Sequence, residues 1–142
     1  KRGVPRPGAE ETGADLRVRQ LRGQPAGPGI ASGPARVISG PEDLLEIRAG
    51  EILVCDAIDP NMTFAVPLAA GIVERRGGML IHGAIIAREY GIPCVTGVPG
   101  AAELIRTGDR VSVDGWLGIV TIEPRLPFER NMGYRETKGV DD

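Results

Sequence analysis

The chain has 142 residues, with 17 Lys and Arg against 19 Asp and Glu and a formal charge of -2. This length suits one compact domain with a sizeable core, and the absence of a basic block argues against nucleic acid as a partner. No apolar run approaches the roughly 20 residues of a membrane span, so we expect no membrane partner and a cytoplasmic protein. Because the chain begins with Lys1, we also expect a fragment or a processed chain.

Glycine and proline, 21 and 12 residues, gather in the first third of the chain and at turn-like positions beyond it. Residues 1–15 combine Gly, Pro and charge without an apolar period, which is typical of a flexible arm or linker. We predict a folded domain over residues 16–123 and a polar, Pro-interrupted tail over residues 124–142.

The first predicted strand covers residues 16–21, where apolar and polar residues nearly alternate. Residues 23–33 indicate a glycine-rich connection with tight turns, and residues 34–38 a second strand. A short helical turn is expected over residues 41–47. Residues 51–55 hardly alternate, which favours a central, buried strand.

Asp59 and Pro60 predict a helix start, because Asp can cap free amides and Pro is tolerated in the first turn. Pro67 should end or kink this helix. A further strand is expected over residues 70–74, leading directly into a pair of glycines.

A helix is predicted from about residue 81 to residue 90, ended by Gly91 with Pro93 beyond. Its apolar residues spread around most of the helical wheel, so we expect it to be largely buried. Arg88 falls in an otherwise apolar sector and should pair with a carboxylate or several carbonyls.

The remaining pattern predicts a short strand over residues 94–97, a helical turn over residues 101–105 and a hairpin with arms at residues 110–114 and 118–122. The fold class is therefore α/β, with a mixed sheet of six to eight short strands and two principal helices.

His82 is the only histidine, and it stands between a two-glycine turn at Gly77 and Gly78 and the predicted helix. At a helix N-terminus, free amides and the helix dipole favour an anion. Gly83 removes a side chain that would crowd a phosphate. A neutral imidazole with an ordinary pKa of about 6.5 is a competent nucleophile toward phosphorus near pH 7.

The sequence lacks the residues that a metal site, a hydrolase or a kinase would need. Cys55 and Cys94 each lie inside an apolar run and are expected to be buried hydrophobes, so no metal site is predicted. The sequence has neither a Gly-x-Ser-x-Gly elbow nor a Gly-x-x-x-x-Gly-Lys-Ser/Thr phosphate loop, which argues against a self-contained hydrolase or kinase.

The segment from Gly77 to Pro93 resembles the phosphohistidine motif of the mobile, or swivelling, domain of phosphoenolpyruvate-utilising enzymes. That family includes phosphoenolpyruvate synthase, pyruvate phosphate dikinase and rifampicin phosphotransferase. The resemblance runs from about residue 23 to residue 122 and implies a swivelling β/β/α domain. Members commonly carry Thr or Ser just before the histidine, where this chain has Leu80 and Ile81, so a hydroxyl contact to the phosphate is not expected.

The resemblance implies that His82 is transiently phosphorylated by ATP or phosphoenolpyruvate through a partner domain and passes the phosphate to an acceptor. The phosphate-supporting residues that it implies are Gly77, Gly78, Gly83, Ala84 and Arg88. The expected partners are an ATP-grasp domain, a phosphoenolpyruvate- or substrate-binding domain, or both. Mg²⁺ is expected with the donor on the partner, and no cofactor on this domain.

On this hypothesis the chain is the phosphohistidine component of a phosphotransferase and is not a complete enzyme alone. The alternative is a non-catalytic binding or scaffold module that retains the swivelling fold, for which the apolar Leu80 and Ile81 leave room.

Overall fold

The structure is a computed structural model that describes residues 18–77 and 82–124, with only the backbone of His82. Residues 20–122 form one unit by their internal contacts. The predicted arm and tail at the two ends of the chain fall outside the described residues, except for Pro124, and stay predictions.

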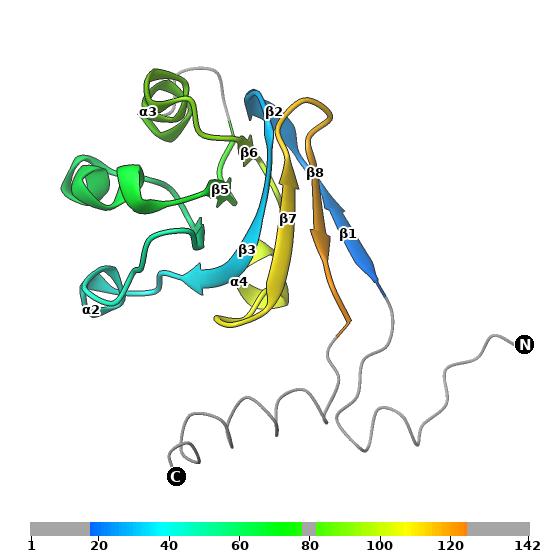
Figure 1. The fold of residues 1–142 in the computed structure, drawn as a ribbon, viewed down its shortest axis with the longest axis horizontal. Helices are drawn as coiled ribbons and strands as arrows, with labels where there is room; N and C mark the ends of the chain where they lie inside the picture. Colours follow the sequence, from blue (N-terminus) through cyan, green and yellow to red (C-terminus); the bar gives the residue numbers. More distant parts are fainter. Residues whose placement is uncertain (1–17, 78–81, 125–142) are drawn as a thin grey trace, which may run out of the picture. The chain divides into compact units, whose positions relative to one another are not determined.

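The described part contains eight strands in one mixed sheet and four short helices (Figure 1). The strands are β1 (Arg19–Arg22), β2 (Gln24–Gly27), β3 (Ile30–Val37), β4 (Ile52–Cys55), β5 (Gly71–Glu74), β6 (Cys94–Thr96), β7 (Arg110–Asp114) and β8 (Ile119–Ile122). The helices are α2 (Pro41–Leu44), the 3-10 helix η1 (Pro60–Leu68), α3 (His82–Tyr90) and α4 (Ala101–Leu104). This confirms an α/β fold with a sheet of short strands, in which η1 and α3, nine residues each, are the principal helices.

The strand order is β1-β8-β7-β3-β4-β5-β6-β2. Strands β3, β4, β5 and β6 run parallel, whereas β2 pairs with β6, β7 with β3, and β8 with β7 in the antiparallel sense. Parallel neighbours need crossover connections, and in this chain α2, η1 and α3 supply them in turn.

The parallel strands are buried on both faces, as the unbroken apolar sequence of β4 predicts. Leu53 and Cys55 pack in one apolar cluster with residues of η1 and α3. Ile52 and Val54 point to the other face, into a second cluster with residues of β7, β8 and α4. Figure 1 shows α2, η1 and α3 on one side of the parallel strands and β7 and β8 on the other. This layering is the β/β/α arrangement that the sequence predicted.

Asp59 caps η1 as predicted, because its side chain accepts a hydrogen bond from the backbone N–H of Asn61 at 2.8 Å. The helix is of the 3-10 type, and Pro67 lies one residue before its end. Because 3-10 helices form short runs and Pro lacks an N–H donor, Pro67 is tolerated where this helix stops.

The prediction of a glycine-rich connection over residues 23–33 is wrong, since β2 and the first half of β3 occupy most of it. The glycines serve close approach of the backbone within the sheet. A Cβ at Gly27 would come within 2.5 Å of the carbonyl oxygen of Ile92, and a Cβ at Gly33 would collide with the carbonyl oxygen of Gly50. Glycine in a strand often has this role, which local sequence cannot distinguish from a turn.

The expectation that α3 is largely buried is also wrong. Ala84 and Ala87 are buried, whereas the side chains of Ile85 and Tyr90 are 49% and 50% exposed. The helix packs by one face, and Arg88 belongs to its exposed residues. Within the described ranges, Arg88 bonds to one backbone carbonyl, that of Ala26, to which Nε donates at 3.0 Å. Gly91, with φ of +68°, ends the helix as predicted.

A partly buried ion pair joins β3 to the residue before β4. Arg36 on β3 donates from Nε and Nη2 to the two carboxylate oxygens of Glu51, at 3.0 and 2.9 Å. Burial opposes ionisation of Glu51, but the bonds from Arg36 and from the backbone N–H of Arg48 outweigh it and lower the pKa of the carboxyl group. The pair fixes the start of β4 against β3.

Replacing Arg36 with Met should lower the free energy of unfolding by about 2 kcal/mol, because the buried carboxylate of Glu51 loses its two charge-assisted hydrogen bonds. Urea unfolding followed by circular dichroism measures this. Arg110→Met, at an exposed position on β7, is the matched control and should change stability by less than about 0.5 kcal/mol. Equal effects of the two variants would contradict the assignment.

Candidate functional site

The site is built on the segment that follows β5. The backbone N–H groups of Arg75 and Arg76 both donate at 3.0 Å, to the carbonyl oxygens of Cys55 and Asp56 respectively. On the other side, the N–H of Gly97 donates to the carbonyl oxygen of Arg76 at 2.8 Å. These bonds extend the pairing of three parallel strands beyond their carboxyl ends, so the chain leaves β5 on a fixed path.

Gly77 lies at the end of this path, against the backbone that follows β6. A Cβ at Gly77 would come within 3.0 Å of Oε1 of Gln24 and 3.1 Å of the Cα of Gly97. The first glycine of the motif is therefore required for close approach of two segments. Gly78, the second one, lies outside the described residues.

Three charged side chains surround the exit from β5. Nε of Arg75 donates to Oδ1 of Asp56, and Nε of Arg76 donates to Oδ2 at 2.9 Å. The hydrogen bond from Arg75, with the nearby charges of both guanidinium groups, holds the pKa of Asp56 below its usual range. One carboxylate thus orients two cations at the carboxyl ends of the parallel strands, where open α/β sheets commonly bind ligands.

Helix α3 returns the chain to the same edge of the sheet, with His82 in its first turn. Gly83, the next residue, is buried against the carboxyl group of Glu74, the last residue of β5. A Cβ at position 83 would come within 2.7 Å of Cδ and 2.8 Å of Oε1 of Glu74. The carboxyl group therefore lies directly beneath the backbone that carries His82.

Glu74 has no exposed surface. Its Oε2 accepts a hydrogen bond from the N–H of Ile58 at 2.5 Å, whereas Oε1 has no hydrogen-bond partner among the described residues. Burial disfavours the charged form and raises the pKa of Glu74 to about 6, against the lowering effect of the Ile58 bond. A carboxyl group that titrates near neutrality at a helix start is a candidate for a functional role.

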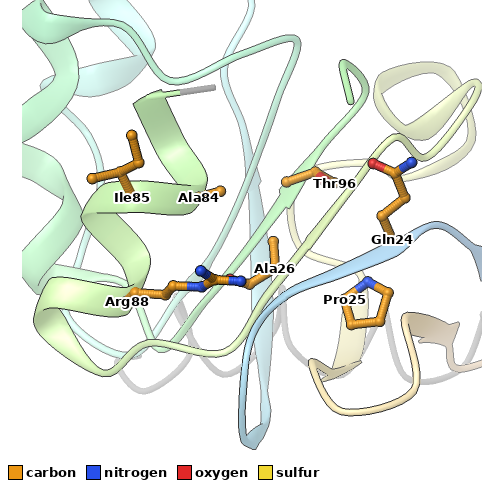
Figure 2. Close-up of a pocket in the computed structure, with 7 residues that line it drawn as sticks. All are labelled: Gln24, Pro25, Ala26, Ala84, Ile85, Arg88 and Thr96. Carbon is orange, nitrogen blue, oxygen red and sulfur yellow. The ribbon is translucent and has the colours of Figure 1, made fainter. Parts of the chain in front are cut away.

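A pocket of about 340 Å³ opens between α3, β2 and β6 (Figure 2). Ala84 and Arg88 line it from α3, and Thr96 lines it from β6. The remaining lining residues are Gln24, Pro25, Ala26 and Ile85. In Figure 2 the side chain of Arg88 extends along the pocket toward Ala26, whose carbonyl oxygen accepts a hydrogen bond from Nε of Arg88.

Several of the residues singled out in the sequence come together here. Ala84 and Arg88 share the pocket, and Gln24 lines it while contacting Gly77. Gly83 does not line the pocket and lies against Glu74. The roles of these residues toward a phosphate stay predictions.

Two parts of the site were missed in the sequence, namely Glu74 and strand β2. The signal for Glu74 is its place at the end of an apolar strand, where an acidic side chain is unusual, with only two residues between it and the glycine pair. Strand β2 gave little signal, since its sequence Gln-Pro-Ala-Gly has the composition of a turn.

The two cysteines are free and buried, as expected. Burial raises the pKa of both thiols, those of Cys55 and Cys94, which keeps them protonated. Within the described ranges, no group of three or more His, Cys, Asp or Glu side chains could hold a metal ion. No helix in the same ranges is long and apolar enough to cross a bilayer.

The sequence matches the family described as "PEP-utilising enzyme, mobile domain" over residues 47–118, about half of the chain. The chain belongs to this family. The matched region contains β4, β5, β6 and α3, and with them Glu74, Gly83 and the three parallel strands at the exit from β5.

Similar mobile domains occur in long enzymes. The chain is 37% identical over 132 residues to a probable phosphoenolpyruvate synthase of Methanothermobacter thermautotrophicus, covering 93% of this chain and 19% of that protein. It is 44% identical over 108 residues to rifampicin phosphotransferase of Bacillus subtilis, covering 76% of this chain and 12% of that protein. The chain therefore spans less than a fifth of the length of these curated relatives.

The fold also resembles a solved structure. An NMR solution structure of an Enzyme I protein superposes with a TM-score of 0.50 at 28% identity, covering 66% of this chain and 39% of that one. The family assignment predicted from the sequence motif is thus confirmed, together with the fold of the mobile domain.

Gly83→Ala should destabilise the mobile domain by about 2 kcal/mol, because the new Cβ collides with the buried carboxyl group of Glu74. In a Glu74→Ala background the same change should be neutral or stabilising, since Ala is the better helix former. Urea unfolding of the two single variants and the double variant measures this coupling. Additive effects would contradict the contact.

The stability of the domain should fall as pH rises from about 4.5 to 7. The folded protein, with the Glu74 pKa at about 6 against an ordinary value of 4.5, binds more protons in this window than the unfolded chain does. The contribution of Glu74 therefore decreases with rising pH, by about 2 kcal/mol in total. Unfolding curves at several pH values should show this fall for the wild type, and a smaller one for Glu74→Gln. A fall of the same size in both proteins would contradict this origin.

Proposed function

We propose that the chain is a phosphoryl carrier in which His82 is transiently phosphorylated. The lone pair of one ring nitrogen forms a bond to phosphorus, while the bond from phosphorus to the leaving oxygen of ATP or phosphoenolpyruvate breaks. The leaving oxygen keeps that electron pair, and the other ring nitrogen keeps its proton. In the second half of the cycle an acceptor oxygen or phosphate takes the phosphoryl group and frees the imidazole.

The observation that carries this proposal is the position of the single histidine in a member of the mobile-domain family. His82 lies in the first turn of α3, beside the carboxyl ends of parallel strands. Free N–H groups and the helix dipole at such a turn favour the negative charge of a phosphoryl group.

Arg88 and Ala84 support the same role through the pocket beside α3. The Nε of Arg88 is committed to the carbonyl oxygen of Ala26, which holds the guanidinium plane in a fixed orientation. A guanidinium held in this way suits recognition of phosphate or carboxylate groups. We propose that it receives anionic groups of the donor or acceptor, with Gly77, Gly78 and Gly83 shaping the backbone around the phosphate.

The loading and unloading machinery is proposed to lie on other domains. The curated relatives are several times longer than this chain, and the matched part is 19% or 12% of their length. We propose an ATP-grasp domain, a phosphoenolpyruvate- or substrate-binding domain, or both as cytoplasmic partners, with Mg²⁺ bound beside the donor. The chain is then part of an enzyme and completes no reaction cycle alone.

His82→Ala should abolish labelling when the chain and its donor domain are incubated with radiolabelled ATP or phosphoenolpyruvate. The wild type should carry acid-labile, alkali-stable label, because phosphorus bound to a ring nitrogen is lost in acid. Label is counted on the gel band before and after acid treatment. Glu89→Gln, an exposed change on the same helix, is the control and should label like the wild type.

Absence of label on the wild type with both donors, or equal label on His82→Ala, would overturn the proposal. The first result would favour a binding module that retains the fold without the chemistry.

A further inference from the structure

The carboxyl group of Glu74 is the one buried acid whose second oxygen has no hydrogen-bond partner in the described part of the chain. Buried polar atoms in folded proteins are nearly always satisfied, so an unsatisfied one asks for an explanation. Burying a charge without a partner is expensive. Among the described residues, the hydrogen bond that this group receives comes from the N–H of Ile58.

The groups that face Glu74 offer no cation from the sheet. Cys55 on β4 and Cys94 on β6 are its titratable neighbours there, and both remain protonated thiols. Asp56, which follows β4, adds a negative charge that works against ionisation of Glu74. On the helix side Glu74 meets Gly83, whereas Arg88, five residues further along α3, is bonded to Ala26.

Arg75 and Arg76, which follow Glu74 in the chain, are both bonded to Asp56. The ionisable residue on the turn that lies against Glu74 is His82, which directly precedes Gly83. We propose that Glu74 is a positioning residue for His82: its carboxylate, held beneath the first turn of α3, stabilises the positive charge that the imidazole gains when it is phosphorylated. The inference rests on the proposed carrier function, and it adds a residue that the sequence motif does not contain.

The charge arises from the chemistry of the ring. A neutral imidazole that forms a bond to phosphorus through one nitrogen, and keeps its proton on the other, becomes a phosphoimidazolium cation. A carboxylate nearby in a poorly polarisable interior favours that cation over the neutral ring. By the same interaction it favours the protonated imidazole of the unphosphorylated protein.

The first test is a titration of His82 by NMR in the 142-residue chain, where the single imidazole gives unambiguous ring resonances. Glu74→Gln removes the charge and keeps an oxygen that can accept from Ile58. The midpoint of the His82 titration should move to lower pH by roughly one unit. Glu74→Asp, which keeps the charge, should restore at least half of the change.

Glu89→Gln is the matched control, because it removes the same charge from the exposed surface of α3. Its effect on the His82 midpoint should be much smaller, since solvent screens exposed charges. Equal effects of Glu74→Gln and Glu89→Gln would overturn the inference.

The second test changes His82 and measures the titration of Glu74. It leaves Glu74 intact, so it applies even if Glu74→Gln fails to fold. His82→Asn should raise the midpoint of the Glu74 carboxyl titration, followed by carbon-13 NMR, because the neighbouring cation is lost. Reciprocity requires a change of about the same size as that of His82 in Glu74→Gln. An unchanged Glu74 midpoint in His82→Asn would overturn the inference.

The third test uses phosphoramidate, which phosphorylates imidazoles without a partner domain: the N–P bond to the ring forms, the P–N bond of the reagent breaks and ammonia leaves. Glu74→Gln should react about three- to tenfold more slowly at pH 8, equivalent to roughly one unit of pKa or less. The ratio of the wild-type rate to that of the variant should rise from near one at pH 5 to a plateau above pH 7, where the carboxylate is ionised.

A ratio of one at every pH would overturn the role of Glu74 in phosphorylation. Failure of the carrier function itself gives a different pattern, in which ATP and phosphoenolpyruvate label nothing through the donor domain while the titrations of His82 and Glu74 remain coupled.

Discussion

The contact between the buried carboxyl group of Glu74 and the first turn of α3 is the constraint on which the site depends. It requires glycine at position 83, since any Cβ would overlap the carboxyl group. It also holds the turn that carries His82 against the end of β5, within a few ångströms of a titratable group. Because the contact is buried, a movement of the helix turn away from β5 would expose the carboxyl group of Glu74.

The parallel strands give this contact its rigidity. Backbone bonds on both sides of the segment after β5 prolong the sheet to Arg76, and Gly77 then packs against Gly97. The chain therefore reaches the glycine pair from a fixed direction and returns on α3 at a fixed height above the sheet. On the proposed carrier function, this fixed path suits a site that two different partners must recognise.

Local sequence was sufficient for the elements whose signals are local. Asp59 and Gly91 mark helix ends through cap geometry, and the apolar residues of β4 mark a central strand, all of which the structure bears out. The family motif identified the fold and His82. Local sequence failed for β2 and the first half of β3, because their glycines are explained by carbonyl oxygens far away in the chain. Local sequence also failed for Glu74, because its contact with Gly83 on α3 is visible only in the folded structure.

The raised pKa of Glu74 has a thermodynamic meaning for a carrier. Near neutral pH the ionised carboxylate destabilises the empty protein, and on the proposed coupling a positive charge on the ring of His82 would remove part of that destabilisation. On this proposal, the destabilisation caused by the buried carboxylate decreases when the imidazole becomes cationic, and it returns when the phosphoryl group leaves. A protonated or amide side chain at position 74 could fill the same space, but it could not respond to the charge of the ring. The volume of the side chain at position 74 therefore sets the shape of the site, whereas its charge sets the proposed response to phosphorylation.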